Sequence, residues 1–233
     1  MQTGYFFCGD ILGFKQIVTS LAAKELDNQI TFWLDLVAKL KNKYKITKCH
    51  IFSDSIFAVV DDYNELQNLI NFCRELLHEG LNQSLPLRGA ISYGEYKWGD
   101  FIHGKAVLRS HKLEQSQDWI GILLDNNINF TTEDYQQLNL VVYPVPMKNE
   151  LIRNFTTISW EVPKFEALAA KLTSLGLGGS PGQGIELDWS WGNKIGNTIA
   201  YGIYLHALKE TRADPSKFHG HHPMHFIDTT LRK

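Results

Sequence analysis

Apolar residues in the first 150 positions follow two spacings, one typical of buried strands and one of amphipathic helices. Short apolar runs predict strands over residues 4–9, 46–52, 55–60, 87–93, 101–103, 119–124 and 140–145, the last ended by Pro144 and Pro146. Helical spacing predicts helices over residues 14–40 with a break at Asp27-Asn28, from the cap Asp62 to a stop at Gly80, from Gly104 to about Gln117, and from Thr131 or Thr132.

The order of these elements favours an α+β fold. Its first half is a βαββαβ unit of the ferredoxin-like kind, in which helices cross one face of a mostly antiparallel sheet. We expect residues 1–146 to form the main domain and residues 147–233 a C-terminal extension. In the extension, the pattern predicts a strand at 155–160, helices at 164–175 and 193–209, a glycine-rich loop at 176–184 and a mobile histidine-rich tail.

Composition excludes some classes of protein. The 23 Lys and Arg residues are balanced by 25 Asp and Glu residues, so no basic field indicates a nucleic-acid partner. The three cysteines, Cys8, Cys49 and Cys73, lie in apolar runs without metal-ligand spacing, as is usual for buried thiols in a reducing compartment. No basic segment precedes the first apolar run, and no run approaches the ~18 residues of a membrane span. We therefore expect a soluble cytoplasmic protein that does not engage a membrane.

Two aspartates carry the strongest chemical signal. Asp10 follows the first strand and precedes a glycine turn and a helix, while Asp54 lies in the turn of the predicted 46–60 hairpin. Either alone is usually a turn or cap residue, but two carboxylates at neighbouring strand ends can hold divalent cations against phosphate oxygens. The carbonyl of Ile11 is a further candidate ligand. The amides expected to face the phosphates are those of Gly13, Phe14 and Lys15. The pattern indicates phosphoryl transfer assisted by two divalent cations.

Four ordered blocks across residues 4–145 resemble the class III nucleotidyl cyclases. Cys8–Phe14 is similar to the family's Phe-x-Asp-Ile-x-Gly-Phe motif, and Ser53–Ile56 to its second metal hairpin. Leu87–Gly94 resembles its Leu-Arg-x-Gly-Ile-x-x-Gly strand, and Gly104–Glu114 the helix after its Trp-Gly turn. The resemblance implies a ferredoxin-like cyclase domain with Asp10, Ile11 and Asp54 as metal ligands.

The sequence departs from the family at the base pocket. His50 stands where purine cyclases carry a base-reading lysine, and Phe101 stands at their base-reading aspartate, with Asp100 one place early. We expect His50, Lys97 and Phe101 to form the wall around a smaller base. A strand histidine bonded internally is the alternative for His50.

The family's transition-state residues are also replaced. Leu108 occupies the position of an asparagine and Lys112 that of an arginine. Lys112 or the neighbouring Arg109 is the candidate for neutralising charge in the transition state, although basic residues on a helix more often face solvent.

A chain that keeps both metal-binding aspartates but lacks the two residues that recognise a purine base resembles the pyrimidine cyclases of bacterial Pycsar antiphage defence. This resemblance implies conversion of UTP, or alternatively CTP, to the 3′,5′-cyclic monophosphate and pyrophosphate with Mn2+ or Mg2+. It also implies a head-to-tail homodimer with active sites at its interface, and a separate effector that responds to the cyclic nucleotide.

Other interpretations remain open. The chain could be an adenylate or guanylate cyclase with an atypical base pocket, or an inactive nucleotide-binding module of cyclase type. A GGDEF-type diguanylate cyclase lacks support because its signature is missing, and the loop at 176–184 lacks the Lys-Ser/Thr ending of a phosphate-binding loop. The histidines at 219, 221, 222 and 225 could bind a transition metal, but no accompanying cysteine or carboxylate pattern favours it.

Overall fold

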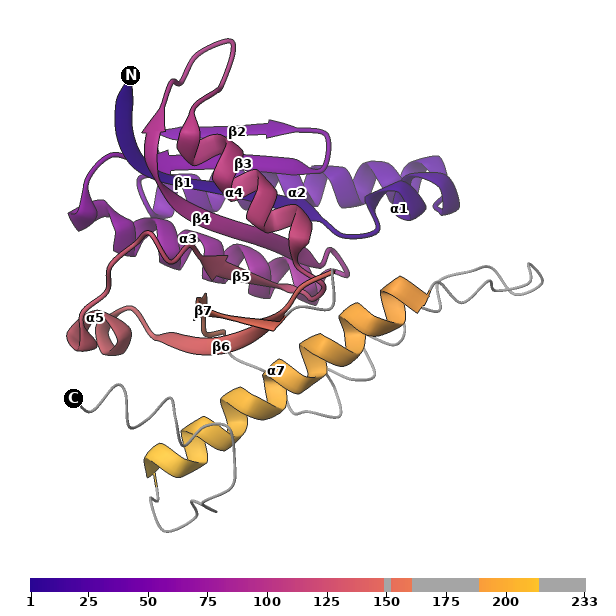
Figure 1. Ribbon diagram of the computed structural model, residues 1–233. Coiled ribbons are helices and arrows are strands. Elements are labelled where there is room, and N and C mark those ends of the chain that lie inside the picture. The colour runs from indigo at the N-terminus through magenta and orange to yellow at the C-terminus, as the bar shows by residue number, and fades with distance from the viewer. Residues whose placement is uncertain (149–151, 161–188, 214–233) are drawn as a thin grey trace.

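The computed structural model describes residues 1–148, 152–160 and 189–213. They form an α+β fold on one seven-stranded sheet with the strand order β2-β3-β1-β4-β5-β7-β6 (Figure 1). The strands are β1 (Gln2–Ile11), β2 (Lys48–Phe52), β3 (Ser55–Val60), β4 (Leu87–Tyr96), β5 (Gly121–Leu124), β6 (Leu140–Pro146) and β7 (Ile152–Ile158). Neighbouring strands are antiparallel except β4 and β5, which confirms the predicted mostly antiparallel sheet.

The described helices cover both faces of this sheet. They are α1 (Phe14–Ser20), α2 (Ala23–Lys43), α3 (Tyr63–Asn82), α4 (Lys105–Ser116), α5 (Thr132–Gln137) and α7 (Trp189–Ala213). The apolar faces of α2 and α3 join the larger core cluster, whereas Ala106 of α4 packs with Phe6 and Cys8 on the opposite face of β1. The four strands β4-β1-β3-β2 and their helices form the predicted ferredoxin-like βαββαβ unit.

The sheet continues across the boundary that we expected at residue 146. Strand β7 lies between β5 and β6, so it belongs to the same sheet as the strands before it. Helix α7 then packs on this end of the core through buried Tyr201, whose hydroxyl donates to the Ile158 carbonyl at 3.0 Å. The Ile120 amide donates to Thr198 Oγ1 at 2.8 Å. The described part of the extension is therefore joined to the sheet by buried hydrogen bonds as well as by apolar contacts.

Two predicted helix boundaries are wrong. The chain between α1 and α2 turns at Leu21 and Ala22, which take extended backbone angles, and α2 runs uninterrupted through Asp27-Asn28 because both residues are on its exposed face. Gly80 does not end α3, which continues to Asn82. A Cβ at Gly80 would lie 2.7 Å from the Leu85 carbonyl oxygen, so this glycine allows the chain that leaves the helix to fold back on it.

Two predicted strand assignments also need correction. Residues 101–103 do not form a strand; only His103 pairs, in an isolated bridge with Lys97. Strand β6 continues through Pro144 to Pro146, which is possible because β6 is at the edge of the sheet and a proline there needs no partner for a missing N–H. The capping box at Thr131 confirms the predicted start of α5.

The predicted helix at 164–175, the loop at 176–184 and the histidine-rich tail lie outside the described residues. Among the helices that are described, none combines the length and hydropathy needed to span a membrane.

Candidate metal and nucleotide site

The two aspartates lie at adjacent positions where β1 ends and β2 turns into β3. Asp10 is opposite Ser55 in the β1–β3 register, and the Ser55 hydroxyl donates to Asp10 Oδ1 at 3.3 Å. The next amide, that of Ile11, donates to the Asp54 carbonyl at 3.2 Å. The tight β2–β3 turn has Ser53 in a left-handed conformation with φ of 57°. The β1–β3 pairing therefore holds Asp54 beside the end of β1.

The environment of Asp10 makes its ionised form unfavourable. The pKa of the Asp10 carboxyl is raised from 3.8 to about 6, chiefly by burial and also by the negative charges of Asp54 and Glu114. Arg88 and the Ser55 hydrogen bond oppose this shift. A half-buried carboxylate held close to a second carboxylate is stabilised when a cation binds between them.

A buried ion pair lies behind Asp10. Arg88 is opposite Asp10 in the β1–β4 register, and its guanidinium donates through Nε to Glu114 Oε1 at 2.8 Å. A second guanidinium nitrogen donates to the Gln117 carbonyl at 3.1 Å. The side chains of Arg88 and Glu114 are only 6% and 4% exposed. This pair connects β4, below the candidate site, to α4.

Sequence reasoning gave no role to this pair, although two signals could have found it. Arg88 interrupts an apolar strand, and Glu114 continues the buried row of Ala106 and Ser110 on α4 at intervals of four residues. Charged residues in such buried positions are usually paired with each other.

The predicted phosphate turn follows directly after the candidate metal ligands Asp10 and Ile11. Gly13 has a φ of 77° and precedes α1, as expected for a glycine that redirects the chain from strand to helix. Phe14 packs partly against the core, whereas Lys15 is exposed. Helix α1 has only seven residues. The structure brings Asp10, Ile11 and Asp54 to one place, with Gly13 and Phe14 beside them.

The predicted base wall is divided along the sheet. His50 is exposed on the edge strand β2, opposite Phe57, which in turn is opposite Cys8. Lys97 and Phe101 are both exposed beyond the end of β4, where Tyr96 is opposite Gln2. Gln2 is eight residues along β1 from Asp10, which corresponds to about 27 Å. A single chain therefore does not bring Lys97 and Phe101 to its own aspartates.

Helix α4 presents the two transition-state candidates differently. Arg109 forms a bidentate ion pair with Asp125, in which one guanidinium nitrogen lies 2.9 Å from Asp125 Oδ1 and the Asp125 side chain is only 2% exposed. Lys112 is exposed, as is Leu108, which is 72% exposed on the neighbouring turn. Arg109 is thus held by an acidic partner, and Lys112 is the more available cation.

The donor set fits hard divalent cations. Carboxylate and backbone oxygens are the ligands that Mg2+ and Mn2+ prefer. Within the described ranges, no group of three or more histidine, cysteine or carboxylate side chains could hold a metal ion. Asp10 and Asp54 would therefore share each cation with substrate oxygens, water or the backbone.

Comparison with solved structures agrees with this architecture. The guanylyl cyclase domain of a rhodopsin fusion protein from Blastocladiella emersonii superimposes with a TM-score of 0.53 and 13% identity, over 68% of this chain and 97% of that one. The fold is that of class III nucleotide cyclase domains. The guanylate cyclase domain from Catenaria anguillulae, solved with GTP, gives a TM-score of 0.52 and 14% identity over 68% of this chain and 96% of its own.

A bacterial light-regulated adenylyl cyclase also superimposes, with a TM-score of 0.52 and 14% identity over 75% of this chain and 98% of that one. No protein-family model matches the sequence, and no curated protein sequence does. At these identities the comparisons show the fold, and the chemistry must be argued from the residues of this chain.

Proposed function

We propose that this protein is a pyrimidine nucleotide cyclase that converts UTP, or alternatively CTP, to the 3′,5′-cyclic monophosphate and pyrophosphate. The observation that carries the proposal is the placement of Asp10 beside Asp54 at adjoining strand ends of a cyclase fold. In the reaction, the 3′ oxygen bonds to the α-phosphorus, the bond from that phosphorus to the bridging oxygen breaks, and the 3′ proton passes to water.

Asp10 and Asp54 are the residues that would hold two divalent cations, Mn2+ or Mg2+, with the Ile11 carbonyl as a further ligand. Such cations favour loss of the 3′ proton and neutralise the charge that develops on the departing pyrophosphate. The Gly13 turn and the amides of Phe14 and Lys15 orient the phosphates. Lys112 adds positive charge near the transition state as a point charge, without the bidentate geometry of an arginine.

The preference for a pyrimidine rests on the base wall. The resemblance assigns purine reading to a lysine and an aspartate, and this chain has His50 and Phe101 at those positions. The exposed imidazole of His50 can exchange hydrogen bonds with a base edge, while Lys97 and Phe101 contribute a cation and an aromatic surface. A purine cyclase with an atypical pocket would share all of the metal chemistry.

The distance between the two halves of the site supports a head-to-tail homodimer. One chain places Phe101 about 27 Å or more from its own Asp10, so a second copy is needed to bring Lys97 and Phe101 to the aspartates. That the same copy also supplies Lys112 is what the resemblance implies. Exposed apolar side chains are available for such an interface, since Phe52, Phe101 and Leu108 are 71%, 76% and 72% exposed. The resemblance alone carries the remaining proposal, that the product activates a separate effector in antiviral defence in the cytoplasm.

The direct test is incubation of the purified protein with Mn2+ or Mg2+ and each of ATP, GTP, CTP and UTP separately, with products identified by mass. Cyclic UMP or cyclic CMP alone supports the pyrimidine proposal. Cyclic AMP or cyclic GMP contradicts the argument from His50 and Phe101 but retains the metal argument. The absence of any product, with triphosphate binding retained, favours the inactive module, which the replacements Leu108 and Lys112 also suggest.

Mixed dimers test where the site is built. Asp54→Asn and Lys112→Ala chains should each be inactive alone, whereas an equimolar mixture should regain up to about a quarter of the wild-type rate if one intact composite site forms in half of the dimers. Mixing Asp54→Asn with Asp10→Asn is the matched control, because both changes affect the same half of the site. Recovery in the control, or none in the test mixture, contradicts the composite site.

A further inference from the structure

Helix α7 of the C-terminal extension approaches the candidate site with its N-terminal end. Figure 1 shows this end of α7 on the same side of the molecule as α1. A Cβ placed on Gly13 would lie 4.0 Å from both Cη2 and Cζ3 of Trp191, which is in the first turn of α7. That distance is an ordinary van der Waals contact, so the six-membered ring of Trp191 faces the backbone of the predicted phosphate turn.

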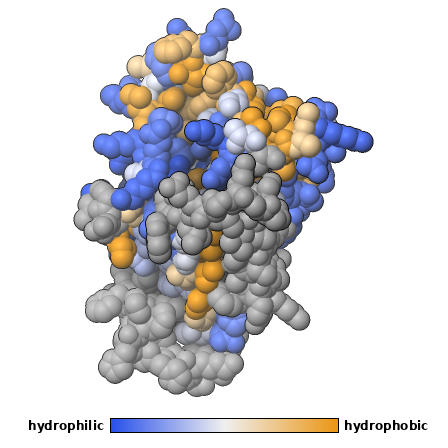
Figure 2. Space-filling model, turned by 90° about the vertical axis from the view of Figure 1, so that its right-hand side faces the viewer, coloured by the Kyte–Doolittle hydropathy of each residue, from blue (hydrophilic) through white to orange (hydrophobic). Residues whose placement is uncertain are grey.

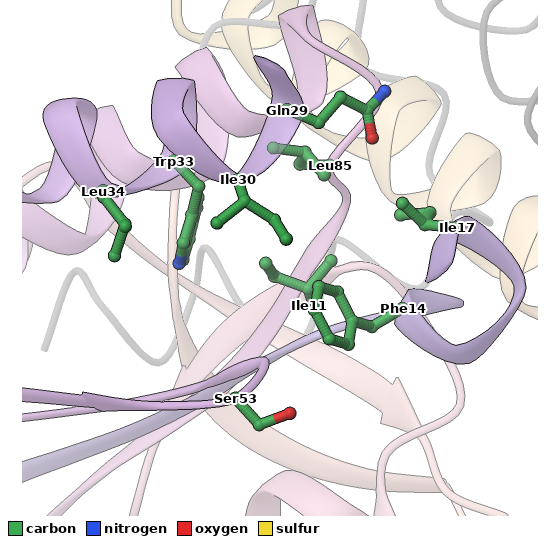
Figure 3. Close-up of a pocket in the computed structure, with 9 residues that line it drawn as sticks. All are labelled: Ile11, Phe14, Ile17, Gln29, Ile30, Trp33, Leu34, Ser53 and Leu85. Carbon is green, nitrogen blue, oxygen red and sulfur yellow. The ribbon is translucent and has the colours of Figure 1, made fainter. Parts of the chain in front are cut away.

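Helix α1, which follows this turn, is lightly packed. Val18 of α1 is 42% exposed, and apolar side chains are exposed among charged ones on the side of the molecule that carries α1 (Figure 2). A groove with a cavity volume of about 220 Å³ lies between α1 and α2 and is lined by Phe14 and Ile17 of α1 (Figure 3). Well-packed interiors leave few such spaces. The turn and α1 are therefore held less firmly than the sheet, and a ring against Gly13 can affect their position.

Buried polar contacts attach α7 itself to the sheet. Lys194 is 8% exposed, and its Nζ lies 3.6 Å from Asp118 Oδ1. Asn197 donates to the Asp118 carbonyl at 2.7 Å, and Thr198 accepts from the amide that directly precedes β5. Trp191, Lys194 and Thr198 follow one another at intervals of three and four residues, so they lie on one face of α7. The helix therefore holds the Trp191 ring in a fixed position relative to the sheet.

Asp118 also connects α7 to the support of Asp10. It directly follows Gln117, whose carbonyl accepts from the Arg88 guanidinium at 3.1 Å. Arg88 is opposite Asp10 in the β1–β4 register. Helix α7 thus contacts both the turn that follows Asp10 and the segment that supports Arg88 behind it.

We propose that Trp191 is a positioning residue for the phosphate turn, through which α7 raises the affinity for the triphosphate. The inference rests on the proposed function, because it takes the Gly13 turn as the phosphate site. The indole ring limits the movement of the turn and keeps its amides directed toward the phosphates. By thermodynamic linkage, a bound triphosphate also stabilises the docked position of α7 by the same factor. An element outside the ferredoxin-like unit thereby regulates substrate binding.

The first test observes Trp191 directly, by nuclear magnetic resonance of the 15N-labelled full chain. The sequence has six tryptophans, and Trp191→Phe identifies the indole signal of Trp191 by its loss. Inorganic triphosphate with Mg2+ is the probe, because it has the phosphates of the substrate without its base. The probe should shift the Trp191 signal saturably, whereas sodium sulfate at equal ionic strength should not. A probe that does not bind, or that binds without shifting this signal, would overturn the proposal.

Matched variants separate positioning from stability. Trp191→Ala should weaken binding of the probe about fivefold or more, as expected for two coupled sites. In turnover it should raise KM by a similar factor and leave kcat within about twofold, since a contact that is equal in the ground and transition states affects KM alone. Trp191→Phe keeps an aromatic ring and should restore most of the affinity. Leu208→Ala, a buried position near the other end of α7, is the control and should leave the affinity unchanged.

The outcomes distinguish this inference from the cyclase function on which it rests. Cyclic nucleotide formed by Trp191→Ala with an unchanged KM would overturn the inference while the cyclase function stands. A shifted Trp191 signal and weaker probe binding by Trp191→Ala, without product from any triphosphate, would contradict the cyclase function and support the inference. An equal loss of affinity in Leu208→Ala and Trp191→Ala would also overturn it, because the effect would then follow from the stability of α7 alone.

Discussion

Replacing Asp10 by asparagine should stabilise the metal-free protein at high pH. The Asp10 pKa is raised from 3.8 to about 6 by burial, Asp54 and Glu114. At 1.36 kcal/mol for each pKa unit, the shift corresponds to about 3 kcal/mol. Because Asp10 is only half-buried, solvent screening reduces this figure, and we expect a gain of about 1–2 kcal/mol. Asparagine keeps an oxygen that can accept from Ser55 and removes the charge.

The sign of the pH dependence follows from the direction of the shift. The folded chain holds the Asp10 proton more tightly than the unfolded chain, so this group makes wild-type stability fall as pH rises from about 4 to about 6. Below that window Asp10 is protonated in both the folded and the unfolded chain, so it no longer lowers the stability of the wild type. The advantage of Asp10→Asn should therefore be complete near pH 8 and almost absent near pH 3.

Urea unfolding in EDTA at both pH values measures this difference. Asp35→Asn, at an exposed position of α2, is the matched control and should change stability little at either pH. Mn2+ at about one hundred times its dissociation constant should then stabilise the wild type by about 2.7 kcal/mol and the Asp10→Asn chain by much less. An Asp10→Asn chain that is less stable than wild type at pH 8, or equally altered at both pH values, would refute the reasoning.

Three further predictions concern the support of the site. Glu114→Ala should destabilise the fold by about 3–5 kcal/mol in urea unfolding because it leaves Arg88 buried and unpaired, whereas the double change Arg88→Met with Glu114→Leu should cost much less. Gly104→Ala should lower stability by about 2 kcal/mol or more, since Gly104 has a φ of 138° and its added Cβ would lie 2.4 Å from the Glu95 carbonyl oxygen; Gly99→Ala, at an open position, is the control. Tyr201→Phe should cost about 1–3 kcal/mol by leaving the Ile158 carbonyl without this donor, and a loss below about 0.5 kcal/mol would mean that α7 does not depend on the bond.

Much of the architecture could be predicted from the sequence because the spacing of apolar residues and the positions of turn residues indicate the same element boundaries. The βαββαβ order follows from short apolar runs that alternate with helical spacing, and the glycine after Asp10 indicates the turn into α1. The break at Leu21-Ala22 was not accessible, because neither residue is a strong helix breaker and Asp27-Asn28 offered a better local signal. Tertiary packing also explains Gly80, which allows the close approach of the Leu85 carbonyl and does not end the helix.

Some features of the candidate site could likewise be predicted from the sequence, and others could not. Asp10 and Asp54 could be paired from sequence because each follows a strand and the strands form neighbouring elements. The separation of Phe101 from these aspartates depends on the β1–β4 register, which no local pattern reports. The Arg88–Glu114 and Arg109–Asp125 pairs join residues 26 and 16 positions apart, so only the folded chain shows which cations already have partners.

The central claim is that Asp10 and Asp54 together form a metal-dependent cyclase site. The most direct test is mass-spectrometric measurement of cyclic nucleotide formed from the preferred triphosphate in Mn2+, with wild type, Asp10→Asn, Asp54→Asn and the exposed-site control Asp35→Asn compared at equal folded concentration. The account predicts product from wild type and Asp35→Asn, and a loss of at least about a thousandfold in both site variants, since each removes a ligand that the transition state needs. Near-wild-type product from either site variant, confirmed as folded, would contradict it.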